Sequence, residues 1–156
     1  MTTHYAKGDS LPAFTMETPE GGTLTRDDLA GQKCVLFFYP KDNTPGCTAE
    51  AKDFSALKNK FDAAGVRVIG ISKDSPQKHR NFIAKHDLKM ELATDAAEDG
   101  LSDKLGIWTE KQMYGRTYMG MVRSTYLLDE KGRILRVWPK VSVKSHAAEV
   151  LDAARA

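Results

Sequence analysis

Several features common in other protein classes are missing from this sequence of 156 residues. It has only two cysteines, Cys34 and Cys47, which are too few for a disulfide scaffold. No apolar run approaches the roughly 20 residues that cross a bilayer. The stretch Met1–Ser10 is polar and lacks the apolar segment of a secretory signal. We therefore expect no membrane association and a cytoplasmic, reducing location, where the cysteines carry chemistry rather than structure.

The charged residues also form no concentrated patch. The 23 basic and 21 acidic residues give a net charge of +2, and no dense run of Lys and Arg occurs. A nucleic-acid partner is therefore not expected. The four histidines, which are His4, His79, His86 and His146, lack metal-binding spacing, and no Cys-x-x-Cys motif occurs. We expect no metal and no cofactor. His79 and His86 are predicted at the core edge or surface, and His146 is predicted to make a structural hydrogen bond.

The order of predicted elements indicates an α/β fold in a single domain, residues 1–156, without repeats or linkers. The run Cys34–Tyr39 is continuously apolar, which is typical of a strand buried on both faces. Other predicted strands are Phe14–Glu17 and Thr23–Thr25 as an N-terminal hairpin, Val66–Ile71, Glu91–Thr94, and Arg123–Leu128 with Arg133–Trp138 as a second hairpin.

Helices are expected between these strands, as apolar periodicity and capping residues indicate. The predicted helices are Thr48–Ala64, one that begins at Ser75-Pro76 and carries Phe82 and Ile83, Ala97–Leu105, and Lys144–Arg155. The stretch Trp108–Met121 shows the least regular pattern. It is predicted to be a long surface loop, and as a loop on a rigid scaffold it is a candidate wall for a functional site.

Cys47 lies where the first buried strand gives way to a helix. A thiol in ordinary surroundings has a pKa of about 8.5 and is mostly protonated at neutral pH. The unpaired N–H groups and the positive dipole end of a helix favour the thiolate. Pro40 ends the strand, Thr44 supplies a hydroxyl, and Gly46 permits a tight entry to the helix. A buried, inert cysteine is the competing interpretation, and these neighbours argue against it.

Segment 39–50, which reads YPKDNTPGCTAE, resembles the active-site signature of peroxiredoxins, and most closely that of the bacterioferritin comigratory protein (peroxiredoxin Q) group. Similar motifs follow in the same order along almost the whole chain. They are Gly8-Asp9 with Pro12-Ala13-Phe14, Gly70-Ile71-Ser72 with Asp74-Ser75, Trp108-Thr109-Glu110-Lys111, Tyr114-Gly115 with Tyr118-Met119-Gly120, and the run Arg123–Asp129.

This resemblance implies a thioredoxin-like fold, with a central mixed β-sheet flanked by helices, and an enzyme that reduces hydroperoxides. It implies that Cys47 is the peroxidatic nucleophile and that Pro40, Thr44 and Arg123 are its partners. The guanidinium of Arg123 is suited to stabilise the thiolate and to bind peroxide oxygen. Glu50, three residues past Cys47, is expected to orient Arg123. An acid that simply favours the helix dipole is the alternative for Glu50.

The sequence departs from the family pattern at the resolving cysteine. Many members carry it five residues after the peroxidatic cysteine, where this chain has Lys52, and others carry it near Ile83. Cys34 begins the strand that leads to the active-site loop. An extended strand rises about 3.3 Å per residue, so Cys34 lies well away from the loop at the far end of this strand. A disulfide between Cys34 and Cys47 would therefore require local unfolding. We therefore expect a one-cysteine mechanism and no resolving role for Cys34.

A one-cysteine peroxidase needs an external thiol, and thioredoxin, glutaredoxin and glutathione are the candidates. We expect a monomer or a weak homodimer; a disulfide between Cys47 and Cys34 of another subunit is a weaker possibility. The sequence is also compatible with a different class of function. A thioredoxin-fold redox sensor or chaperone-like binding module would be oxidised once, without sustained turnover.

Overall fold

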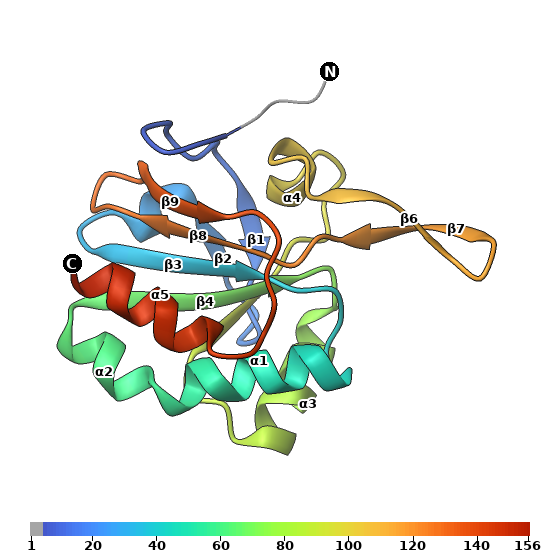
Figure 1. Ribbon diagram of the computed structural model, residues 1–156, viewed down its shortest axis with the longest axis horizontal. Helices are drawn as coiled ribbons and strands as arrows, with labels where there is room; N and C mark the ends of the chain where they lie inside the picture. Colours follow the sequence, from blue (N-terminus) through green and yellow to red (C-terminus); the bar gives the residue numbers. More distant parts are fainter. Residues whose placement is uncertain (1–4) are drawn as a thin grey trace.

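The computed structural model describes residues 5–156. The first four residues of the expected domain, including His4, lie outside this part. Seven strands form one mixed sheet in the order β2-β1-β5-β4-β3-β8-β9, as the α/β prediction required (Figure 1). They are β1 (Thr15–Glu17), β2 (Thr23–Thr25), β3 (Lys33–Phe38), β4 (Val66–Ser72), β5 (Glu91–Thr94), β8 (Ser124–Leu128) and β9 (Ile134–Trp138).

The centre of the sheet is parallel and its edges are antiparallel. Strand β3 pairs parallel with β4, which pairs parallel with β5. On its other side β3 pairs antiparallel with β8, which continues into β9. The predicted N-terminal hairpin is present as β1 and β2, and it joins the sheet through β5. The sheet therefore matches the predicted central mixed sheet.

Strand β3 divides the core into two clusters because its side chains alternate between the two faces of the sheet. Val35, Phe37 and Tyr39 belong to one cluster, together with Cys47. Cys34 and its even-numbered neighbours belong to the other. All side chains from Cys34 to Tyr39 are fully buried, as the apolar run predicted.

The cluster that contains Cys47 is covered by four helices (Figure 1). They are α1 (Pro45–Ala56), α2 (Lys58–Ala63), α3 (Pro76–His86) and α5 (His146–Arg155). The opposite cluster is covered by the N-terminal segment, the 3-10 helix η1 (Arg26–Leu29) and α4 (Leu101–Lys104). Helix α4 is shorter than the predicted Ala97–Leu105, because Gly100 adopts extended backbone geometry at its N-cap.

The predicted single helix Thr48–Ala64 is wrong in two respects. It begins earlier, at Pro45, because proline suits the first helical position. It is also interrupted at Leu57, whose φ of −96° and ψ of 4° separate α1 from α2. The apolar periodicity continues across this break, so the pattern alone does not reveal it.

The predicted surface loop Trp108–Met121 is also wrong. It forms a β-hairpin of β6 (Trp108–Met113) and β7 (Arg116–Met121), joined by Tyr114 and Gly115 with positive φ. Figure 1 shows this hairpin extending away from the sheet. Most of its side chains are exposed on both faces, so no alternation of buried and exposed residues marks the strands in the sequence.

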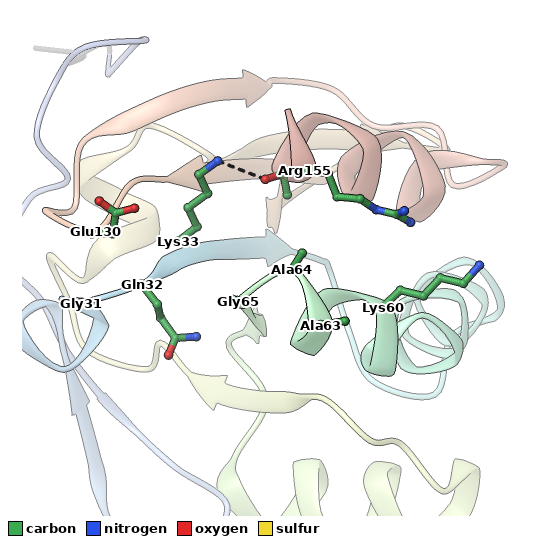
Figure 2. Close-up of a pocket in the computed structure, with 10 residues that line it drawn as sticks. Gly31, Gln32, Lys33, Lys60, Ala63, Ala64, Gly65, Glu130 and Arg155 are labelled. Atoms are coloured by element: carbon green, nitrogen blue, oxygen red, sulfur yellow. Dashed lines mark hydrogen bonds between the residues drawn. The ribbon is translucent and has the colours of Figure 1, made fainter.

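A cavity of about 810 Å³ lies at the end of the sheet where β3 and β4 begin (Figure 2). Lys33 donates from Nζ to the carbonyl of Ala154 at 3.1 Å. The side chains of Lys60 and Arg155 extend away from Lys33 (Figure 2). The basic groups here do not converge on one point, and Cys47 is not among the lining residues.

Candidate active site

Cys47 lies in the first turn of α1 and is almost fully buried, with 1% of its surface exposed. Thr44 is the N-cap and Pro45 follows as the first helical residue. The predicted junction between strand and helix is therefore present. At this position the sulfur lies near the positive end of the helix dipole, which favours negative charge on it.

Arg123 reaches both Cys47 and Glu50. Its Nη2 donates to Cys47 Sγ at 3.3 Å, and its Nη1 donates to Glu50 Oε1 at 2.6 Å. The register explains the approach, because Phe38 at the end of β3 pairs with Ser124 at the start of β8. Arg123 immediately precedes β8, so it lies beside the loop that leads to Cys47. The guanidinium thus links the thiol to a buried carboxylate.

Glu50 is 1% exposed, and its second oxygen, Oε2, has no hydrogen-bond partner among residues 5–156. Burial raises the pKa of Glu50 to about 7, although the positive charge of Arg123 opposes this rise. The structure places Glu50 in contact with Arg123. This contact is necessary for the predicted role of Glu50, which is to orient Arg123. Because Glu50 is buried, it is more than a solvated acid near a helix end.

The loop before Cys47 contains the other three predicted residues. Thr44 Oγ1 donates to the carbonyl of Lys41 at 2.8 Å and makes no capping bond to the helix. A Cβ atom on Gly46 would lie 3.2 Å from Nη2 of Arg123, which is closer than most such contacts. Gly46 therefore leaves room for the guanidinium beside Cys47. Pro40 lines a cavity beside this loop.

Cys34 lies on the opposite face of the sheet. Its side chain is fully buried, and burial raises the pKa of its thiol to about 12. The two other positions considered for a resolving cysteine lie on helices: Lys52 is exposed on α1, and Ile83 is half-buried on α3. Both cysteines are free thiols.

A buried polar cluster below the loop was not predicted. His79 is completely buried, so its prediction as a core-edge or surface histidine is wrong. Its Nδ1 lies 2.7 Å from Asp42 Oδ2, and its Nε2 lies 3.1 Å from the carbonyl of Ala93. Tyr39 donates its hydroxyl to Asp42 at 2.6 Å. The available signal was that His79 precedes Phe82 by three residues on the apolar face of α3.

The other two histidines of the described chain play different parts. His146 Nε2 lies 2.8 Å from Thr125 Oγ1, the structural hydrogen bond that was predicted. His86 is half-buried at the end of α3.

Lys111 is a second cation near the site that sequence reasoning missed. Its Nζ donates to the carbonyl of Met121 at 2.5 Å. Burial lowers the pKa of Lys111, and the positive charge of Arg123 lowers it further. Its stem crosses Gly120, where a Cβ atom would lie 2.8 Å from Lys111 Cδ. Lys111 lies near Arg123 because of the β6–β7 hairpin. The sequence pattern did not reveal this hairpin, so it could not predict the position of Lys111.

Two further observations concern metals and membranes. Within residues 5–156, no group of three or more His, Cys, Asp or Glu side chains is arranged to hold a metal ion. None of the helices in this range combines the length and apolar character needed to cross a bilayer.

Comparison with known proteins places this chain in a family. Residues 7–137 match the AhpC/TSA family. The chain is 43% identical to peroxiredoxin Bcp of Xanthomonas campestris, over 94% of this chain and 93% of that protein. It is 41% identical to peroxiredoxin Bcp of Bacillus subtilis, over 93% and 92%.

Solved structures agree with these sequence matches. Peroxiredoxin Q of X. campestris superposes with a TM-score of 0.86 at 37% identity, covering 99% of this chain and 96% of that one. A structure of the X. campestris bacterioferritin comigratory protein, studied for its alkyl peroxide reduction activity, has a TM-score of 0.86 at 36% identity, covering 99% and 98%. The chain therefore belongs to the AhpC/TSA family and, within it, to the Bcp (peroxiredoxin Q) group of peroxiredoxins.

Proposed function

We propose that this peroxiredoxin is a thiol-dependent peroxidase in which Cys47 attacks the peroxide. The observation that carries the proposal is the guanidinium of Arg123, which donates to both Cys47 Sγ and Glu50 Oε1. A positive group with fixed donors stabilises the thiolate and offers hydrogen bonds to a peroxide oxygen. The alkyl peroxide reduction activity of the X. campestris relative supports organic hydroperoxides as substrates, and we propose hydrogen peroxide as a second substrate.

In the first step the thiolate of Cys47 attacks the terminal oxygen of the peroxide. The S–O bond forms as the O–O bond breaks, so sulfur becomes sulfenic acid. The leaving alkoxide or hydroxide takes a proton and departs as alcohol or water. Arg123 lies against the sulfur and is placed to stabilise negative charge as it moves from sulfur to the leaving oxygen.

The other residues support this geometry. Thr44 carries a hydroxyl in the N-cap position of α1, where it is suited to bind a peroxide oxygen. Gly46 leaves space for Arg123, and Pro40 restricts the backbone where the chain leaves β3 and enters the loop. Glu50 orients the guanidinium through its short hydrogen bond.

We further propose that Cys47 works without a resolving cysteine. Lys52 and Ile83 occupy the two positions where relatives carry one, and Cys34 is buried on the other face of the sheet. A disulfide requires Cα atoms within about 7 Å. The sulfenic acid is therefore reduced by an external thiol, with thioredoxin, glutaredoxin and glutathione as candidates.

All residues of the proposed mechanism come from one chain, so a monomer or weak homodimer suffices. Reduction by external thiols requires a compartment that supplies them, and we propose the cytoplasm for this reason.

The test follows peroxide consumption with excess thiol for wild type, Cys47→Ser and Cys34→Ser. We expect Cys47→Ser to abolish turnover and Cys34→Ser to retain it. Many turnovers per protein distinguish an enzyme from a sensor that is oxidised once. If Cys34→Ser also stops turnover, the one-cysteine mechanism is wrong.

A further inference from the structure

A second cavity, of about 670 Å³, lies beside the active-site loop. Its polar wall carries four lysines from four separate segments, and we call it the lysine groove. The lysines are Lys41 in the active-site loop, Lys73 after β4, Lys78 in the first turn of α3, and Lys111 on β6. Its apolar wall includes Trp108 and Tyr118 from the β6–β7 hairpin. The groove therefore combines positive charge with an aromatic surface.

Most of this positive charge lacks an acidic partner. In the described part of the chain, only Lys73 among the four lies within 4.0 Å of carboxylates, those of Asp95 and Asp103. The one acid in the wall, Asp74, directs Oδ2 to Ser72 Oγ and to the backbone N–H of Asp42. The N-terminal end of α3 adds its positive dipole.

The groove shares two residues with the active-site loop. Pro40 and Lys41 line it and belong to the loop that leads to Cys47. Lys111 lines it as well, and burial together with the positive charge of Arg123 lowers the pKa of this lysine. Cys47 and Arg123 are not themselves among the lining residues, so a molecule in the groove would contact the active-site loop through Pro40 and Lys41.

We propose that the lysine groove binds an anionic low-molecular-weight thiol that carries more than one carboxylate, as glutathione does, and presents it to oxidised Cys47. This inference rests on the proposed function, because it concerns the reductant in that cycle. A cavity of this size suits a tripeptide rather than hydrogen peroxide. Lysines on separate segments suit carboxylates at separate ends of the ligand, with the thiol between them.

The bound thiol completes the cycle in two steps. Its thiolate attacks the sulfur of the Cys47 sulfenic acid, a disulfide forms, the S–O bond breaks, and hydroxide takes a proton and leaves as water. A second thiolate then attacks the ligand sulfur of this mixed disulfide. The ligand leaves as its own disulfide, and Cys47 returns as thiolate. The two thiols supply the two electrons that the peroxide removed.

The cavity at the other end of the sheet provides the matched control. It also contains lysines, but the side chain of Lys60 extends away from Lys33 (Figure 2), and no residue of the active-site loop lines this cavity. Lys60→Glu changes the net charge by the same amount as Lys78→Glu. Both lysines are exposed on helices, so both variants should fold.

The experiment begins from preformed sulfenic acid. One equivalent of hydrogen peroxide is added, and Cys47 oxidation is verified by mass spectrometry after trapping with a dimedone-type reagent. Glutathione or its diethyl ester, which lacks the free carboxylates, is then mixed rapidly with the oxidised protein. The rate of mixed-disulfide formation is measured for wild type, Lys78→Glu, Lys41→Glu and Lys60→Glu.

We expect the ratio of the glutathione rate to the ester rate to fall roughly fivefold in Lys78→Glu and Lys41→Glu, because each reverses one charge of the groove. The ratio should stay at the wild-type value in Lys60→Glu. Raising the salt concentration should lower the ratio in wild type.

Three results would overturn the inference. In the first, the ester reacts with wild type as fast as glutathione does. In the second, Lys78→Glu and Lys60→Glu behave alike. In the third, Lys78→Glu slows oxidation by a carboxylated hydroperoxide and leaves the glutathione step unchanged, so that the groove is a peroxide subsite. If Cys47 forms no sulfenic acid at all, the proposed function itself fails before any thiol is added.

Discussion

Cys34 and Cys47 are both almost completely buried, yet the groups that surround the two thiols differ. Cys34 points into one apolar cluster, and burial raises the pKa of its thiol to about 12. Cys47 belongs to the cluster on the other face, lies in the first turn of a helix, and accepts a hydrogen bond from Arg123. Burial alone therefore does not determine whether a cysteine is inert or reactive.

The difference arises from two local features of the chain. The alternation of side chains along β3 directs Cys34 away from the active-site loop. The register between β3 and β8 brings Arg123 to the loop end, where Cys47 lies. Both cysteines belong to the same strand-to-helix unit. Only Cys47 has a cation and a helix N-terminus beside it, and these compensate its thiolate for the solvation lost on burial. Changing these compensating groups tests the comparison directly.

The largest effect after loss of Cys47 itself is expected from Arg123→Lys. Lysine keeps the positive charge but cannot donate in a fixed fork to both Cys47 and Glu50. We expect the second-order rate of Cys47 oxidation by hydrogen peroxide to fall roughly 100-fold. Stopped-flow fluorescence or competition with a peroxidase of known rate measures this constant.

Arg133→Lys is the matched control, because Arg133 is exposed near the start of β9. It should retain the wild-type rate. A wild-type rate in Arg123→Lys would mean that charge alone suffices and that the two-pronged contact is unimportant.

A smaller effect is expected from Glu50→Gln on the pH dependence of stability. Below pH 4.5 the carboxyl is protonated in both folded and unfolded chains. Between pH 4.5 and about 7 the folded protein retains a proton that the unfolded chain loses, so the folded state loses stability as pH rises. Above about pH 7 the carboxyl is ionised in both the folded and the unfolded chain, so the loss of stability no longer changes with pH.

Glutamine has no such proton, so Glu50→Gln should gain stability relative to wild type by roughly 2 kcal/mol between pH 5 and pH 8. Urea unfolding at the two pH values measures the difference. Glu98→Gln, at an exposed position, should show no comparable change. Equal pH dependence in wild type and Glu50→Gln would show that the buried carboxyl is not protonated near neutral pH.

Much of this arrangement could be predicted because it depends on local signals. The apolar run of β3, the turn before Cys47 and the final hairpin each carry a strong pattern, and they determined the sheet and the position of the thiol. The contact between Arg123 and Glu50 spans 73 residues. It was predicted because an unpaired carboxylate three residues after Cys47 would disfavour the thiolate, and the family resemblance also suggested it. The place of Arg123 in the site came from that resemblance, because a lone arginine at a strand end is usually solvated.

Other features escaped prediction for physical reasons. The β6–β7 hairpin is exposed on both faces, so burial imposes no alternation on its sequence. His79 is buried with both ring nitrogens paired, by Asp42 and by the carbonyl of Ala93, and these partners are distant in sequence. The lysine groove requires four segments that only the folded sheet brings together. Such sites depend on tertiary contacts, which local periodicity does not record.

The smallest effect is expected from Cys34→Ala, and it tests the inert side of the comparison. The side chain packs in the core and makes only a weak contact to the carbonyl of Val35, at 3.8 Å. Removing its sulfur should lower the free energy of unfolding by about 1 kcal/mol, through lost packing. Peroxide turnover with excess thiol should be unchanged. Urea unfolding and peroxide consumption measure the two quantities on the same preparation. Lost turnover in a variant that remains fully folded would mean that Cys34 takes part in the cycle, so that its burial beneath the sheet is relieved during catalysis.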